Sequence, residues 1–330
     1  MRTPFTRPWL SRRRPTQQRP QRPRLSLEQL EDRLAPATIA VTTTADDITP
    51  NDGTVSLREA ITAINAGNNL GDPDIIAQNP GTFGTNDTIK FNIPGAAPFQ
   101  INVGSSASAL GQALPALTKP VLIDGTSQPG FAGKPIVVLN GLAAGANANG
   151  LDIELAGTPA AATPGVTVQG LVIDQFSANG IQVGADAFSG FATTVNTITG
   201  NFIGTAVSGN TAAANGLNGI FVNGVDSNNT GTEASNNVIS KNVISGNTND
   251  GVLIQANANG IASGNVVTGN FIGTNAAGTA ALANGSHGVD INNASGNTVG
   301  GTTAAARNVI SGNGGDGVRI VGVFSSPGTN

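Results

Sequence analysis

Short apolar runs recur along most of the chain, and glycine and asparagine separate them. Between residues 166 and 320 the runs come in sets of three, "N-φ-φ-x", then "N-φ-I-[GS]", then "[NDH]-G-φ-x-φ", where φ is an apolar residue. Short β-branched runs bounded by turn-forming residues are typical of strands rather than helices. The pattern therefore predicts a succession of coils, each containing three short strands.

An internal repeat indicates how the coils are arranged. Asn196–Thr205 nearly recurs as Asn265–Thr274, at an offset of 69 residues, and six apolar runs lie between Gly219 and Gly288. One period therefore holds two coils. Such short strands cannot bury their apolar sides alone, whereas strands stacked about 4.8 Å apart share one core. We expect an all-β fold, a parallel β-helix, and the general rule for parallel crossovers makes it right-handed.

Four regular coils are predicted, a less regular coil precedes them, and residues 150–153 are a candidate for the third strand of a still earlier coil. Because strand side chains alternate between faces, six third-strand residues are expected to point into the core. They are Val252, Ile254, Val289, Ile291, Val318 and Ile320. The strands of the five coils are expected at residues 166–168, 171–173 and 179–183; 196–198, 201–203 and 218–222; 237–239, 242–244 and 250–254; 265–267, 270–272 and 287–291; and 297–299, 308–310 and 316–320.

Asparagine recurs at one corner of the last four coils, as Asn201, Asn242, Asn270 and Asn308. Asparagine tolerates the left-handed backbone of a tight bend, and stacked amides can hydrogen-bond to one another. We predict a structural asparagine ladder at this corner. The alternative is that these side chains are ligands.

Long and short connections alternate between the second and third strands. Residues 204–219 and 273–288 form equal long loops, whereas residues 246–250 and 312–316 form short turns. Loops in equivalent coils should emerge on the same side of a β-helix. We therefore expect a ridge of long loops, and loops are where binding residues concentrate.

The segment 37–84 has a different pattern. Residues 37–44 alternate and predict a strand. Ser56 and Glu59 have the spacing of a capping box, and an amphipathic helix follows until residues 65–67 end it. Its apolar face contains Leu57, Ala60, Ile61 and Ile64. We expect this strand and helix to cover the open end of the solenoid, where an exposed edge invites aggregation.

Residues 41–47 and 55–61 (VSLREAI), with residues 121–130, resemble the CSLREA domain found at the start of bacterial secreted β-helix proteins. This chain has Val55 where that family has its cysteine. Residues 24–36 resemble the "L-E-x-L-E-D-R-x-x-P" signature of exported planctomycete proteins. These resemblances imply a secreted or cell-surface protein whose body has the pectate-lyase-like β-helix fold.

The leader, residues 1–36, is rich in arginine and proline and is expected to be disordered, apart from a short helix at residues 25–34. It lacks the apolar core of an ordinary secretory signal. An unstructured basic tail and a nucleic-acid-binding arm remain alternatives to an export leader. The β-helix is expected over residues 85–324 and a tail over 325–330. No recognisable cap follows the last coil, so a truncated or partial chain is expected.

Composition narrows the class further. Residues 36–330 carry seventeen acidic and seven basic residues, which argues against nucleic-acid binding by the folded part. The chain has no cysteine and therefore no thiolate metal site. No apolar run approaches about 20 residues, so no membrane span is expected. The oligomeric state stays open.

Candidate chemistry is sparse. Asp250, His287 and Asp316 occupy equivalent corners of successive coils and are the best catalytic candidates, although aspartate, asparagine and histidine all suit turns. Asp46 and Asp47 are a candidate Ca²⁺ site, with a solvated acidic turn as the alternative. No other cofactor is expected. The body lacks the tryptophan and tyrosine of typical sugar platforms.

Two functions follow as hypotheses. The first is a non-enzymatic extracellular or cell-surface module for adhesion, spacing or matrix building, whose partner is a glycan or a surface protein. The second is a divergent polysaccharide lyase or glycoside hydrolase, which would need paired carboxylates or a calcium-assisted base.

Overall fold

The computed structural model describes residues 35–84, 86–106, 109–155, 165–184, 195–225 and 233–322. Residues 35–330 form one compact unit, and residues 1–34 are a separate unit. The predictions for leader residues 1–34, for a helix at 25–34 and for the tail at 325–330 fall outside the described residues. The prediction of disorder is wrong for the last two leader residues, because Pro36 forms a parallel bridge with Thr82.

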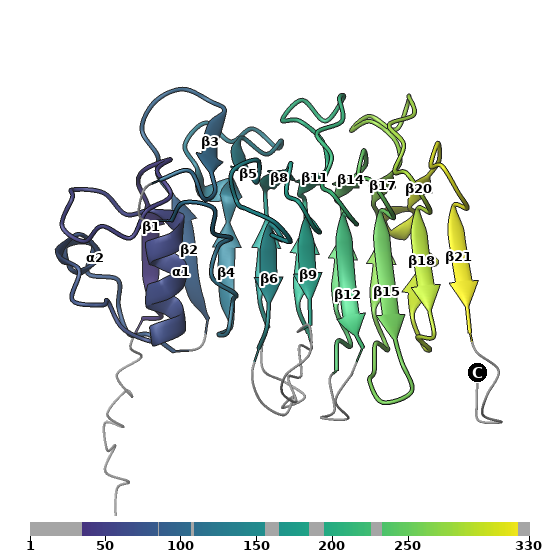
Figure 1. Ribbon diagram of the computed structural model, residues 1–330, viewed down its shortest axis with the longest axis horizontal. Helices are drawn as coiled ribbons and strands as arrows, with labels where there is room; N and C mark the ends of the chain where they lie inside the picture. Colours follow the sequence, from purple (N-terminus) through teal and green to yellow (C-terminus); the bar gives the residue numbers. More distant parts are fainter. Residues whose placement is uncertain are drawn as a thin grey trace, which may run out of the picture. The chain divides into compact units, whose positions relative to one another are not determined.

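Parallel pairing joins all the strands of the described chain into three sheets, which confirms the parallel β-helix (Figure 1). The first sheet holds β1 (Thr38–Val41), β2 (Asp87–Phe91), β4 (Val121–Asp124), β7 (Thr167–Gln169), β10 (Thr197–Thr199), β13 (Val238–Ser240), β16 (Val266–Thr268) and β19 (Thr298–Val299). The second holds β3 (Phe99–Asn102), β5 (Val137–Asn140), β8 (Leu171–Asp174), β11 (Phe202–Ile203), β14 (Val243–Ile244), β17 (Phe271–Ile272) and β20 (Val309–Ile310). The third holds β6 (Leu151–Ile153), β9 (Ile181–Val183), β12 (Ile220–Gly224), β15 (Val252–Ala256), β18 (Val289–Asn292) and β21 (Val318–Val321).

The register stacks equivalent residues of successive coils. Ile198 pairs with Ile239, and Ile239 with Val267, and all three are buried. Burying one such side chain stabilises a fold by about 1.5–3 kcal/mol. The five predicted coils are therefore present, and a sixth complete coil, β4, β5 and β6, precedes them.

The residues of the third strands that were predicted to point inward share one face in β15, β18 and β21, because the strands pair in register, but those of β21 are exposed. Val252, Ile254 and Val289 are fully buried, whereas Val318 is 42% and Ile320 73% exposed. The physical reason is position: within the described part of the chain, β21 pairs only with β18. Its core-facing side has no described coil beyond it.

The N-terminal end of the stack is covered as expected. Helix α1 (Leu57–Ala66) packs on β1 and β2, and its apolar face is buried (Figure 1). Gly67 ends the helix with a left-handed backbone at φ 68°. A second short helix, α2 (Pro73–Ala77), was not predicted; Asp72 at its N-cap followed by Pro73 was its signal. Two 3₁₀ turns lie at Gly125–Ser127 and Ala304–Ala306.

The predicted asparagine ladder is present at the corner between the first two sheets. The side-chain amides of Asn201, Asn242 and Asn270 each donate to the Oδ1 atom of the next ladder asparagine at 3.1 Å, ending on Asn308. Two further asparagine ladders, which sequence reasoning missed, occupy other corners. One runs through Asn196, Asn237, Asn265 and Asn297, and the other through Asn215, Asn247, Asn284 and Asn313.

The left-handed residue at the ladder corner is not the asparagine. It is the preceding residue, Gly200 at φ 67°, Lys241 at φ 58° and Gly269 at φ 68°. The ladder asparagine directly precedes the next strand, and its own backbone N–H donates to the Oδ1 atom of the neighbouring coil, as Asn201 N does to Asn242 at 2.9 Å. The bend must therefore be made one residue earlier.

The two long loops lie on the same side of the stack, above the second sheet in Figure 1. Each folds back on itself, with antiparallel bridges Thr205–Ala212 and Thr274–Ala281. The loops also touch one another, because the backbone N–H of Ala276 donates to the carbonyl of Gly209 at 2.9 Å. The loops cover a small apolar cluster on the outer side of the second sheet. Its members are Val138, Val172, Phe202 and Val243, flanked by Val207, Phe271 and Ala276.

Candidate functional site

The three catalytic candidates belong to a fourth corner column, which leads into the third sheet. It begins with asparagines, and Asn179 donates its side-chain amide to Asn149 Oδ1, as Asn218 does to Asn179 Oδ1, both at 3.0 Å. Asp250, His287 and Asp316 continue this column in the next three coils. Sequence reasoning placed the three candidates at equivalent corners, where its coil pattern also placed Asn179 and Asn218, but it predicted no hydrogen bonds along this column.

Hydrogen bonds between coils bind the candidates together. The Asp250 backbone N–H donates to Asn218 Oδ1 at 3.1 Å, and that of His287 donates to Asp250 Oδ1 at 2.8 Å. The Asp316 N–H donates to His287 Nδ1 at 2.9 Å. A ring nitrogen that accepts this bond places the proton of a neutral imidazole on Nε2. Asp250 and His287 thus occupy the acceptor positions that asparagine occupies in the earlier coils.

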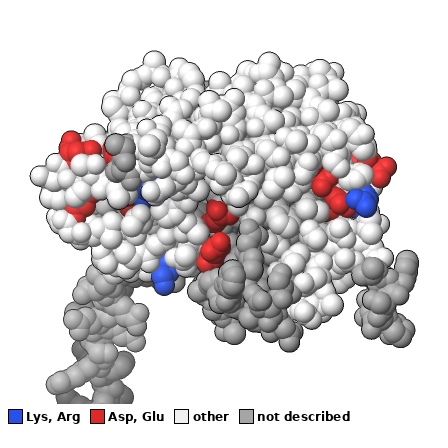
Figure 2. Space-filling view, viewed as in Figure 1, with Lys and Arg blue, Asp and Glu red and all other residues white. Residues whose placement is uncertain are grey.

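Asp290 and Arg319 lie beside this column on the outer side of the third sheet. Their backbones are in register, and Arg319 Nη1 lies 3.3 Å from Asp290 Oδ2 and 3.4 Å from His287 Nε2. Figure 2 shows charged side chains of both signs gathered near this end of the face (right). Sequence reasoning placed Asp290 and Arg319 in the outward column but did not connect them with His287.

Asp290 is the most unusual member of this group. It is 3% exposed, and its Oδ1 atom is buried without a hydrogen-bond partner among the described residues. Burial raises the pKa of Asp290, and the charge of Asp250 adds to this increase, while Arg319 and His287 oppose it. A buried carboxyl group with a raised pKa is a candidate general acid.

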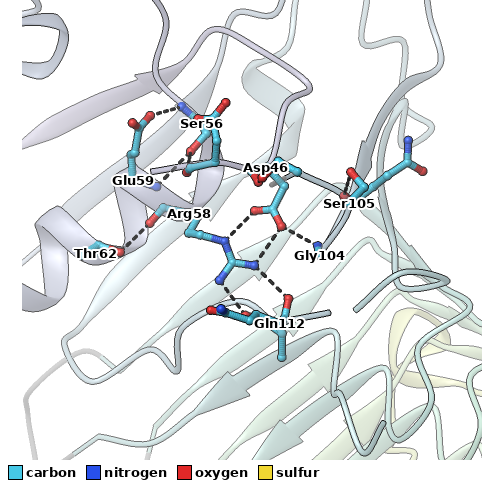
Figure 3. A network of polar contacts seen from close by, with 12 residues as sticks. Asp46, Ser56, Arg58, Glu59, Thr62, Gly104, Ser105 and Gln112 are labelled. Atoms are coloured by element: carbon cyan, nitrogen blue, oxygen red, sulfur yellow. Dashed lines mark hydrogen bonds and ion pairs between the residues drawn. The ribbon is translucent and has the colours of Figure 1, made fainter. Parts of the chain in front are cut away.

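A second polar network ties the N-terminal cap together (Figure 3). The predicted capping box is present: the Ser56 N–H donates to Glu59 Oε2 at 2.8 Å, and the Glu59 N–H donates to Ser56 Oγ at 3.1 Å. Arg58 makes a two-bond ion pair with Asp46, at 2.9 and 2.8 Å. Its other contacts are the carbonyls of Gln112 and Ala113.

These contacts change the expectation for Asp46. Its side chain is fully buried, and besides Arg58 it accepts the Gly104 backbone N–H at 2.6 Å. The prediction of a solvated acidic turn is therefore wrong for Asp46, whose charge the pairing with Arg58 already neutralises. Asp47, the other member of the predicted calcium site, is partly buried.

No group of three or more histidine, aspartate or glutamate side chains in the described ranges is placed to hold a metal ion. The helices of the same ranges are also too short or too polar to cross a membrane. Neither the scan against protein-family models nor the search among curated proteins finds a match for this chain. The resemblance to CSLREA and planctomycete proteins stays a prediction.

Proposed function

We propose that this chain is a non-enzymatic extracellular or cell-surface β-helix module, which serves adhesion, spacing or matrix building. One observation carries the proposal: the best catalytic candidates form hydrogen bonds that join adjacent coils. Asp250 and His287 each accept a backbone N–H from the next coil, in a column that begins with asparagines. These hydrogen bonds explain why Asp250 and His287 occupy their positions without a catalytic role.

The ridge of long loops is the proposed contact surface. Loops 204–219 and 273–288 contain no charged residue apart from the titratable His287. Figure 2 shows their side of the molecule free of Lys, Arg, Asp and Glu over the part facing the viewer. A surface of this kind favours neutral partners, bound through hydrogen bonds and van der Waals contacts. We therefore propose that the partner is a neutral glycan or an uncharged protein surface.

A glycan array and a panel of purified surface proteins test this function. We expect the chain to bind neutral ligands. The affinity should change little between 50 and 500 mM NaCl, because salt weakens only interactions between charges and the contact surface contributes no charge pair. Thr211→Lys and Thr279→Lys, at exposed loop positions, should weaken binding. Thr298→Lys, exposed on the first sheet, is the matched control. Unchanged binding by both loop variants would reject the loop surface.

The buried, unpartnered Oδ1 of Asp290 supports a second candidate function, a divergent polysaccharide lyase or glycoside hydrolase. Here Asp290 would be the general acid and Asp250 or His287 the base. A cleavage screen over neutral and acidic polysaccharides separates the two functions. Cleavage that disappears in Asp290→Asn would establish the enzyme and overturn the non-enzymatic proposal. An absence of cleavage across the screen would remove the second candidate.

A further inference from the structure

The loop between β1 and helix α1 carries acidic side chains that the cap does not neutralise. Asp47 and Asp52 lie in this loop, Glu59 lies in the first turn of α1, and Asp72 caps α2. Asp72 Oδ1 lies 3.4 Å from the Asn51 backbone N–H. The nearest base, Arg58, is already paired with Asp46. The remaining carboxylates have no cation beside them in the described interactions.

Ser56 holds Asp47 and Glu59 close together. Its Oγ atom donates to the backbone carbonyl of Asp47 at 2.7 Å, and its N–H donates to Glu59 Oε2 at 2.8 Å. The bond to Asp47 is made to its main chain, whereas the bond to Glu59 uses one oxygen of its carboxylate. Asp47 Oδ1 and Glu59 Oε1 are both buried without a hydrogen-bond partner among the described residues.

Two buried, unpartnered carboxylate oxygens on either side of one serine are costly. An unsatisfied buried polar group destabilises the folded state, and more so when it is charged. Glu59 is only 4% exposed. Burial raises the pKa of Glu59 to about 7, and the charge of Asp47 adds to this increase. Burial also raises the pKa of Asp47, and the charge of Asp52 adds to it. Both groups therefore lack a positive partner.

We propose that Asp47 Oδ1 and Glu59 Oε1 bind Ca²⁺, which fastens the loop before α1 to the first turn of the helix. Hard divalent cations take carboxylate oxygens and complete their shells with carbonyl oxygens and water. The proposed pair replaces the Asp46–Asp47 pair suggested by sequence, because Asp46 is bound to Arg58. The site lies in the cap and is independent of the function proposed for the loops.

Calorimetric titration of the EDTA-treated full chain with CaCl₂ tests the site, together with hydrogen exchange of α1. Ca²⁺ is expected to bind at one site and to slow exchange of the α1 amides at least tenfold. Glu59→Gln and Asp47→Asn should abolish both effects. Both substitutions keep an acceptor oxygen in the side chain, and the glutamine of Glu59→Gln can still accept the Ser56 N–H, so the variants should fold. Asp316→Asn, at an exposed carboxylate in the last coil, is the control.

Three results would overturn the proposal. They are no heat of Ca²⁺ binding in the wild-type chain, an unchanged response in both cap variants, or the same protection of α1 by NaCl at matched ionic strength. The last result would reduce the effect to screening of the acidic loop. In EDTA, both variants should be at least as stable as the wild type, because each removes a buried charge. If one variant is less stable than the wild type in EDTA, the Ca²⁺ response of the other variant decides the test.

Discussion

Asn270 Oδ1 accepts both the backbone N–H and the side-chain amide of Asn242, at 2.9 and 3.1 Å. The Asn242 amide also donates to the carbonyl of Ile198, and its own Oδ1 accepts two bonds from Asn201. All four hydrogen-bonding positions of a fully buried side-chain amide are therefore used. Asparagine here joins three coils at a point where the backbone turns away from the sheets.

Replacing Asn242 by alanine should therefore be severe. It leaves the buried backbone N–H of Asn201 and one of the two protons of its side-chain amide without acceptors, and we expect a loss of about 3 kcal/mol in the free energy of unfolding. Asn308→Ala is the matched variant at the less buried end of the same ladder and should cost about 1 kcal/mol. Urea unfolding followed by circular dichroism measures both. A cost of Asn242→Ala well below about 1 kcal/mol would show that the ladder does not hold the coils together.

A glycine column gives a second prediction. A Cβ atom on Gly251 would lie 2.6 Å from the carbonyl oxygen of Gly288 in the next coil, whereas one on Gly317 meets nothing closer than 3.7 Å. Gly251→Ala should lower the free energy of unfolding by at least about 2 kcal/mol, because backbone must move. Gly317→Ala, in the same column of the last coil, should be nearly neutral. If the two variants unfold at the same temperature, the stacking distance is wrong.

Periodicity predicted the coils because apolar residues face one shared core and every strand is used in the same way. The ladder at Asn201 was predictable because each of its asparagines directly precedes a recurring apolar strand motif. The ladder through Asn215 and Asn247 was not, because Asn215 lies in a long loop and Asn247 in a short turn, where no strand motif marks the position. Equivalent residues of that ladder are recognised from their positions in the structure and not from their separation along the chain.

The charged clusters were less predictable. Asp290 and Arg319 stand in register, yet the burial of Asp290 depends on side chains from neighbouring coils, which no single strand reveals. The pairing of Asp46 with Arg58 joins a loop to a helix. Sequence showed only two adjacent aspartates, and the same pattern suits a calcium site and a buried ion pair.

The cap should become less stable as pH rises in calcium-free buffer. The pKa of Glu59 is about 7 in the folded chain, above its ordinary value of 4.5, so the folded state binds more protons between these values. The free energy of unfolding should therefore fall by about 2 kcal/mol as pH rises from 4.5 to 7. Glu59→Gln should flatten this dependence. Exchange of the α1 amides at several pH values measures it, and an unchanged slope in the variant would assign the effect to other groups.

The Arg58–Asp46 ion pair makes a further prediction. Arg58→Met leaves the Asp46 carboxylate buried without its counter-charge and should destabilise the cap by about 3–5 kcal/mol. Adding Asp46→Asn removes the stranded charge and keeps an acceptor for the Gly104 N–H, so the double variant should recover part of the loss. Thermal unfolding of the three chains measures this. No recovery in the double variant would mean that the packing of Arg58, and not its charge, stabilises the cap.

The most direct test of the structural role of the third-sheet column is the stability of Asp250→Asn. The new amide can donate to Asn218 Oδ1, as Asn218 donates to Asn179, while its Oδ1 still accepts the His287 N–H. If the column is part of the frame, urea unfolding should show a free energy equal to or about 1 kcal/mol above that of the wild type, with binding by the loops unchanged. A clear loss of stability, or the loss of a polysaccharide-cleaving activity, would contradict the structural account.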